Sequence, residues 1–367
     1  MNPARPSSVP GGVRRLALSQ VLKWAVPACL VGAVLAPAAV VQAAPEPDAK
    51  YVYTGQAMGT VITVYMWTDD EARAARAAQG VFEEMKRLDG VMTTWTPDSE
   101  VSKVNAAAGV APVVVSAETF AVIERAQDVA IKSRGVFDIT VGAFKGLWKF
   151  DQDMDGSLPA PADVKQRLRL IGYRHLKLDK KKRTVFLAKK GMSITLGGIA
   201  KGYAVDRCVA MLQDQGFVNF MIQAGGDMYV AGKKGVDPWV VGIRDPRGVH
   251  EAMFALAPIE DHSFSTSGDY ERGFVQDGVR YHHILDPRTG QPARASRSVT
   301  IRAKDAFTAD AWSKVLFILG WKQTVALIAR EKLTDFEVVQ IDDQNVVHMT
   351  PGIERVLKLV KPPTPGP

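Results

Sequence analysis

Two neighbouring glycines and a lysine form the first segment that could do chemistry. Gly197 and Gly198 stand between a predicted strand and a predicted helix, and Lys201 follows in the first helical turn. Glycines at such a junction let the backbone approach a phosphate, and the helix start supplies free N–H groups. The segment is not a P-loop, because the lysine precedes Gly202 and no Ser or Thr follows it. A tight strand-to-helix turn would explain the same glycines equally well.

A pair of histidines, His282 and His283, precedes a turn-forming run that extends from Asp286 to Gly290. Since histidine changes its charge near neutral pH, a histidine held at this position could act as a general base. The alternative is a histidine that only caps the turn. Shortly before it, a hydroxyl-rich segment extends from Ser265 to Gly268.

A third segment extends from Thr308, a predicted N-cap, to Lys314. Asp310, Ser313 and Lys314 share one helix face, because residues three and four apart are neighbours. An aspartate with a hydroxyl one turn later suits a hard cation such as magnesium, whose coordination phosphate oxygens would complete. The alternative is an Asp–Lys pair on a solvated helix, worth about 0.2–0.5 kcal/mol.

Hydrophobic periodicity predicts the elements that must position these residues. Apolar residues every three to four positions predict helices over residues 71–88, 117–133 (with Ser116 as N-cap), from about 200, and over 309–319. Short apolar or alternating runs predict strands over 61–66, 192–196, 217–223, 239–243 and 298–303. Because no β-α-β repeat is present, we expect an α+β fold, one compact body of two lobes with mixed sheets and packed helices.

The two ends of the chain differ in composition from its middle. Residues 1–43 carry four cations and no acid, with Arg14 and Arg15 before an apolar stretch and small residues at 41 and 43. This pattern predicts a cleaved signal peptide, with twin-arginine export as one route and a membrane anchor as the alternative. We therefore expect a periplasmic or otherwise exported protein with one folded domain over 44–360. The proline-rich residues 361–367 predict a disordered tail.

Charge and cysteine content exclude two classes of protein. The net charge of the 367-residue chain is +7, and without the leader it falls to +3, too weak and scattered for a nucleic-acid partner. Cys208 is the only cysteine after the leader, so an internal disulfide is excluded. Its position among apolar residues predicts a packed side chain rather than a nucleophile.

Taken together, the segments resemble a known family. Further stretches agree with the same pattern in the same order, over residues 57–60, 94–102, 135–142 and 242–246. From about residue 51 to 320 the chain resembles the FAD:protein FMN transferases, also called ApbE-type flavin transferases or thiamine-biosynthesis lipoproteins. The resemblance implies an enzyme that moves FMN from FAD onto a threonine of an acceptor flavoprotein and releases AMP. Such acceptors belong to electron-transfer chains, so a membrane-associated partner is expected.

The resemblance also implies roles for particular residues. FAD would be held by Met58, Trp95, Val136, Phe137, Asp138, Thr195, Lys201 and Ile284, and His283 would deprotonate the acceptor threonine. The magnesium ligands would be the Gly198 carbonyl, Asp310 and the next turn of that helix, where Ser313 offers a hydroxyl. Two alternatives stay open: a protein that binds FAD with little or no transfer, and an FAD pyrophosphatase.

Two positions depart from the family pattern. Thr195 stands where many relatives have aspartate, and Lys314 stands where the family has threonine. An ammonium about 4 Å from a divalent ion would meet a repulsion of roughly 8 kcal/mol at an effective dielectric of 20. Either Lys314 swings away and leaves a weaker metal site, or its charge replaces the metal beside the phosphates.

Overall fold

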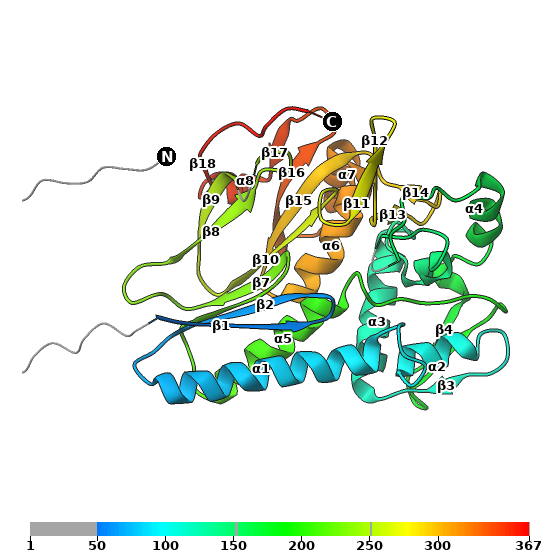
Figure 1. Cartoon of the computed structure of the whole chain (residues 1–367), viewed down its shortest axis with the longest axis horizontal. Helices are drawn as coiled ribbons and strands as arrows, with labels where there is room; N and C mark the ends of the chain where they lie inside the picture. Colours follow the sequence, from blue (N-terminus) through cyan, green and yellow to red (C-terminus); the bar gives the residue numbers. More distant parts are fainter. Residues whose placement is uncertain (1–49, 151–152, 250–251, 367) are drawn as a thin grey trace, which may run out of the picture. The chain divides into compact units, whose positions relative to one another are not determined.

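The structure is a computed structural model that describes residues 50–150, 153–249 and 252–366. The predicted signal peptide lies outside the described residues. The described residues belong to one compact unit (Figure 1). Within the described residues, no helix combines the length and hydrophobicity needed to cross a membrane.

An antiparallel sheet of eight strands is the centre of this unit. Its order is β1 (Lys50–Ala57), β2 (Thr60–Trp67), β6 (Phe220–Ala224), β7 (Asp227–Ala231), β10 (His262–Gly268), β15 (Ser296–Ala303), β16 (Phe336–Asp342) and β17 (Val347–Met349). Successive side chains of a strand point to opposite faces. In β16, accordingly, Val338 belongs to one hydrophobic cluster and Val339 to another. Both faces of the sheet are therefore covered.

Helices cover one face of the sheet and a small sheet covers the other. The helices include α1 (Glu71–Met92), α5 (Ala200–Asp214) and α6 (Ala306–Leu319), with α5 in contact with both of the others (Figure 1). On the other face lies the three-stranded sheet of β8 (Trp239–Arg244), β9 (Met253–Ile259) and β18 (Lys358–Leu359). The expected α+β class with packed helices is confirmed, but the sheets, expected to be mixed, are antiparallel.

The remaining elements extend this core. A second small sheet has β3 (Val113–Val114), β5 (Thr184–Leu187) and β4 (Leu176–Asp179), and two hairpins pair β11 (Gly273–Gln276) with β12 (Val279–His282) and β13 (Leu285–Asp286) with β14 (Gln291–Pro292). The other helices are α2 (Glu100–Ala106), α3 (Ala117–Lys132), α4 (Pro161–Leu168), α7 (Trp321–Glu331), α8 (Pro351–Glu354) and the 3₁₀ turns η1 (Ile139–Phe144) and η2 (Tyr173–His175).

Most predicted elements are present, and one strand is not. Residues 192–196 form no strand, because the side chain of Asn105 takes the place of a partner strand: it accepts a hydrogen bond from the Ile194 N–H at 2.7 Å and donates one to the Ile194 carbonyl at 2.9 Å. The predicted N-cap at Ser116 is confirmed, since its hydroxyl accepts from the N–H of Thr119. Cys208 is fully buried in the core, and burial raises the pKa of its thiol to about 12.

The beginning of α6 and the end of the chain differ from the predictions. Helix α6 begins at Ala306, and its N-cap is Asp305, which accepts from the N–H of Thr308. The tail predicted to be disordered instead makes specific contacts, because the buried carboxylate of Asp245 binds it. The Lys361 ammonium lies 2.9 Å from this carboxylate, and the Thr364 hydroxyl donates to it at 2.6 Å.

Candidate functional site

A cleft of about 1450 Å³ collects residues from most parts of the domain. Ligand sites usually have about 300–1,000 Å³, so this cleft has room for a dinucleotide. Of the residues to which the resemblance assigns a role, ten line it: Met58, Trp95, Val136, Phe137, Asp138, Thr195, Gly198, Lys201, His283 and Ile284. Asp310 and Ser313, two of the predicted metal ligands, are not among its lining residues.

Lys201 is held by an aspartate that the sequence did not reveal as functional. Its ammonium lies 2.6 Å from the carboxylate of Asp227, the first residue of β7, which is buried and also accepts a hydrogen bond from the Ser265 hydroxyl. Burial would raise the pKa of Asp227, but the charges of Lys201 and Lys314 outweigh it and hold this pKa below its ordinary value. Asp227 is therefore ionised, and its only signal in the sequence is a charge directly after the turn Gly225-Gly226.

Asp310 forms a second charged pair on α6, the helix that packs against α5. Its side chain is fully buried, and one carboxylate oxygen contacts the ammonium of Lys314. The other oxygen accepts the backbone N–H of Gly202 at 2.9 Å. That approach requires glycine, because a Cβ at position 202 would lie 2.5 Å from the Ala306 carbonyl. We call Lys201, Asp227, Asp310 and Lys314 the charged cluster.

Lys314 reaches the cleft although its helix is buried. Its side chain is 17% exposed and lines the cleft, while Asp310 lies behind it. Burial lowers the pKa of Lys314 to about 7, with Lys201 adding to the lowering and Asp227 opposing it. The alternative of an ion pair on a solvated helix face is therefore wrong.

The two neighbouring histidines have different environments. His282 is buried: its Nδ1 accepts the N–H of Ile284 at 3.3 Å and its Nε2 donates to the Ala293 carbonyl at 2.8 Å. His283 lines the cleft, with Nδ1 3.3 Å from the Arg272 carbonyl. A neutral imidazole that donates from Nδ1 has a free lone pair on Nε2. Of the two, therefore, only His283 has a nitrogen available to take a proton.

The surroundings keep His283 neutral. Although the residue is solvent-exposed at the cleft, desolvation by the surrounding protein lowers its pKa, and the neighbouring His282 and Arg272 add to this effect. A base that is unprotonated at neutral pH can accept a proton from a hydroxyl in the transition state. The geometry of His283 thus fits a general base better than a turn cap.

The hairpin between β1 and β2 brings Met58 to the cleft. Met58 and Gly59 both have positive φ, 52° and 67°, as expected for a two-residue turn of type I′. This conformation is unusual for methionine, and Asp89 of α1 holds it by accepting the Met58 N–H at 3.0 Å. The Arg272 guanidinium donates to the Gly59 carbonyl at 3.2 Å. Asp89 and Arg272 also line the cleft and were not found from the sequence.

Aromatic rings make up another part of the lining. Trp148 stacks on Phe150 at 5.5 Å and on Tyr281 at 6.1 Å, and Phe274 contacts both Phe150 and Tyr281. We call these four residues the aromatic stack, of which Trp148 and Phe150 line the cleft. Trp95, predicted to stack on FAD, is 56% exposed, and the Lys145 ammonium lies 4.2 Å from its ring.

Asp138 has a structural role in its immediate surroundings. One carboxylate oxygen accepts the N–H and hydroxyl of Thr140, and the other accepts the N–H of Tyr173 at 2.6 Å. Burial raises the pKa of Asp138 despite these bonds. The residue thus caps the η1 turn, directly after Val136 and Phe137, which line the cleft. Nearby, the Thr195 hydroxyl accepts the N–H of Gly197 at 3.3 Å.

The predicted magnesium ligands do not fit a divalent ion in this arrangement. Both oxygens of Asp310 already have partners, and the Ser313 hydroxyl contacts the Asp310 carbonyl and the Ser267 hydroxyl, both at 2.8 Å. Gly198 alone of the three faces the cleft. Among the described residues, no group of three or more His, Cys, Asp or Glu side chains could hold a metal ion.

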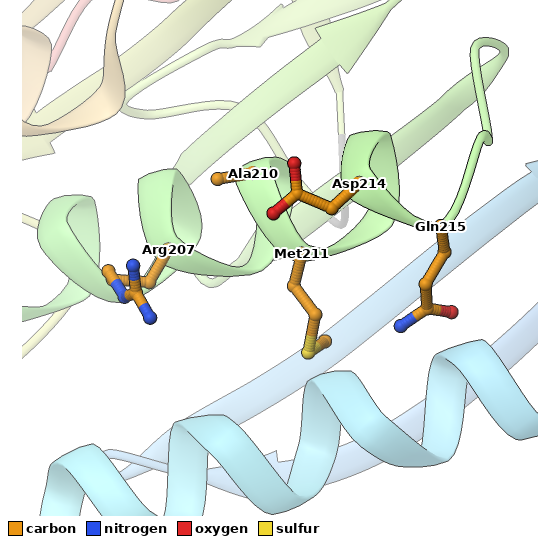
Figure 2. A pocket seen from close by; sticks show the side chains of 5 residues that line it. All are labelled: Arg207, Ala210, Met211, Asp214 and Gln215. Carbon is orange, nitrogen blue, oxygen red and sulfur yellow. The ribbon is translucent and has the colours of Figure 1, made fainter.

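A second hollow, of about 340 Å³, lies on α5 and is lined by Arg207, Ala210, Met211, Asp214 and Gln215. Figure 2 shows these side chains along α5, with Met211 pointing toward α1. Arg207 lies 3.6 Å from Glu118 and 3.8 Å from Glu84, so its charge is already matched. With none of the converging groups of the large cleft, this hollow is not a candidate active site.

Comparison with known proteins agrees with the geometry of the cleft. The model of the ApbE family matches residues 58–339. The chain belongs to the ApbE family. An FAD:protein FMN transferase of Klebsiella pneumoniae is 35% identical over 286 residues, which are 78% of this chain and 87% of the relative. The FAD:protein FMN transferase of Treponema pallidum is 36% identical over 74% of this chain and 79% of its own length.

Solved structures of the ApbE family have the same fold. The ApbE protein of Thermotoga maritima superposes with a TM-score of 0.76 and 34% identity, over 84% of this chain and 99% of that one. The flavin transferase ApbE of Vibrio cholerae gives a TM-score of 0.75 at 28% identity, over 84% of this chain and all of that one. The predicted family and fold are confirmed, and membership makes this chain a transferase.

Proposed function

We propose that this chain is an exported FAD:protein FMN transferase, which moves FMN from FAD to a threonine of an acceptor flavoprotein. The observation that carries the proposal is the meeting, in one large cleft, of the two lysines of the charged cluster with the neutral imidazole of His283. Family membership supplies the reaction class, because the relatives named above are FAD:protein FMN transferases.

The reaction is a phosphoryl transfer with a hydroxyl as nucleophile. The acceptor threonine loses its proton to Nε2 of His283 while its oxygen bonds to the phosphorus on the FMN side of FAD. The bond from that phosphorus to the bridging oxygen breaks, and AMP leaves with that oxygen. General-base assistance of this kind is typically worth about 10²–10⁴-fold in rate.

Lys201 supports the reaction through its positive charge and takes no part in proton transfer or bond formation. Its ammonium is fixed by Asp227 at 2.6 Å, so it does not need to reorganise when negative charge develops on the phosphates. FAD would lie with its pyrophosphate beside Lys201 and Gly198, at the start of α5, where backbone N–H groups favour anions. Its rings would contact Trp95, Phe137 and the neighbouring aromatic residues.

The acceptor and the compartment belong to the same proposal. The leader-like composition of residues 1–43 supports export, and the acceptor would then be a flavoprotein of the same compartment, including membrane-associated electron-transfer proteins. N-terminal sequencing of the protein isolated from the envelope tests this part. A start near Ala44 is expected, and a start at Met1 would contradict export with cleavage.

Mass spectrometry of a candidate acceptor domain tests the activity itself. The domain is incubated with FAD and this protein, with and without magnesium, and an identical sample receives the His283→Ala variant. FMN linked to one threonine, with an equal amount of AMP, is expected only for the native protein. Free FMN and AMP would indicate a pyrophosphatase instead, and intact FAD with an unmodified acceptor would indicate a binding protein.

A further inference from the structure

The charge of Lys314 occupies the position from which Asp310 would bind a cation. Asp310 is fully buried, with one oxygen against the Lys314 ammonium and the other against the N–H of Gly202. Of these residues, Lys314 lines the cleft and Asp310 does not. A cation that entered from the cleft would therefore meet an ammonium before it met the carboxylate.

Other oxygen atoms near Asp310 do not make up for the carboxylate oxygen that Lys314 occupies. The hydroxyl of Ser313 donates within its own helix to the Asp310 carbonyl and pairs with Ser267 from β10. A hard divalent ion needs about six oxygen ligands and loses its water reluctantly. The Gly198 carbonyl would then be the one predicted protein ligand left for such an ion, which is too few for a stable site.

The two lysines of the charged cluster are built alike. Lys201 is anchored by the buried Asp227 and Lys314 by the buried Asp310, and both lysines line the same cleft. Each carboxylate offsets the cost of burying one ammonium, since an unpaired buried charge is strongly unfavourable. The result is a pair of anchored lysines that face one cleft. The pKa of Lys314 is lowered to about 7 by burial, and a pyrophosphate bound beside it would favour its charged form. Each ammonium then has donors to spare for the anion, because an ammonium has three.

We propose that Lys314 is a built-in counter-ion for the FAD pyrophosphate, so that this chain binds FAD through Lys201 and Lys314 without a divalent cation. The inference rests on the proposed function and deepens it, because it names how the substrate phosphates are held. Lys314 is a binding residue in this account, and Asp310 is the residue that positions it.

Titration of FAD by fluorescence, in EDTA and in magnesium, tests the inference. Native protein should bind FAD with the same affinity, within about twofold, in both buffers. Lys314→Met should lose about 10- to 100-fold in EDTA, the scale of a hydrogen bond to a charged group. Lys314→Thr should show the same loss in EDTA and recover at least about tenfold in magnesium, since a hydroxyl can coordinate the ion.

Two further variants test whether the loss of FAD binding comes from misfolding or from the loss of any lysine. Lys314→Met leaves Asp310 buried without its partner, so a double variant with Asp310→Asn removes both charges and should show the same loss of FAD with a native melting curve. Lys322→Met, on the exposed side of α7, is the matched control and should bind FAD like the native protein.

Each result has a definite meaning. A native protein that loses tenfold or more of its FAD affinity in EDTA would overturn the inference while leaving the proposed function intact. Native-like binding by Lys314→Met in EDTA would overturn it as well. Absence of FAD binding by native protein in both buffers would overturn the proposed function, and the inference with it.

Discussion

The charged cluster and the aromatic stack each contribute side chains to the same cleft but are built differently. The charged cluster comes from the central sheet and its helices, with Lys201 on α5, Asp227 on β7 and the Asp310–Lys314 pair on α6. The aromatic stack comes from the residues after η1 and from the β11–β12 hairpin. Rigid elements therefore hold the charges, while loops and a small hairpin hold the rings.

This difference matches the two chemical parts of FAD. A pyrophosphate needs charges at fixed positions, because electrostatic stabilisation depends on donors that do not reorganise. Flat rings tolerate more adjustment, since stacking is broad in its geometry. Loss of a charge from the charged cluster should therefore weaken FAD binding in a salt-dependent way, and loss of an aromatic ring from the cleft should weaken it independently of salt.

The largest expected effect lies between the two groups, at His283. His283→Ala should lower the rate of FMN transfer by about 10²–10⁴-fold and leave FAD affinity within about twofold, because the role of this residue concerns the acceptor proton. Single-turnover assays with fluorescence titration measure both quantities. His175→Ala, outside the cleft lining, is the matched control. Transfer at the native rate would contradict the assignment, since both ring nitrogens of His282 are already bonded.

Loss of charge at Lys201 should come next. Lys201→Ala should weaken FAD binding by about 1.5–3 kcal/mol, the usual scale for a hydrogen bond to a charged group. The difference from native protein should shrink as salt is raised, because screening weakens the native charge. Lys322→Ala serves as the control, and a melting curve of each variant checks that the unpaired Asp227 has not unfolded the domain. Equal FAD affinity would reduce Lys201 to a structural partner of Asp227.

Loss of an aromatic ring should be smaller and insensitive to salt. Trp95→Ala should weaken FAD binding by about 0.5–1.5 kcal/mol through lost stacking, and Trp95→Phe should retain most of it. Titration at low and high salt distinguishes this variant from Lys201→Ala. A salt-dependent loss would mean that the Lys145 ammonium over the Trp95 ring, rather than the ring itself, contributes the binding.

The smallest expected effect concerns pH. The general base acts only when unprotonated, and the cleft lowers the pKa of His283 below its ordinary value. With saturating acceptor and saturating FAD, so that the charge state of Lys314 does not limit binding, the rate should therefore change by less than about twofold between about pH 6.5 and 8, with the acid-side fall below this range. A half-maximal rate near neutral pH would show that another group, or an unshifted histidine, limits the reaction.

Local motifs made part of the site predictable from the sequence. Lys201 could be placed near a phosphate because the glycines that let the backbone approach a phosphate, Gly197 and Gly198, lie just before it in the chain. Asp227 could not be paired with it, since that contact joins α5 to β7. The i, i+4 spacing revealed the Asp310–Lys314 pair, but its burial depends on the close approach of α5 at Gly202.

The same limits apply to the histidines and to the fold. Neighbouring residues in an extended chain face opposite sides, so the pattern alone does not show which histidine faces the cleft, and only the family resemblance pointed to His283. Helices with clear periodicity, such as α1 and α3, were predicted nearly to their ends. The apolar run at 192–196 predicts a strand, and the sequence around it does not reveal that the side chain of Asn105 replaces a partner strand.

A crystal structure of the native protein with FAD, grown without divalent cations, tests the central claim most directly. We expect FAD in the large cleft, with its pyrophosphate oxygens within hydrogen-bond distance of the ammonium groups of both Lys201 and Lys314. Nε2 of His283 should face the phosphorus on the FMN side. A pyrophosphate held away from both lysines, or FAD bound outside this cleft, would contradict the account.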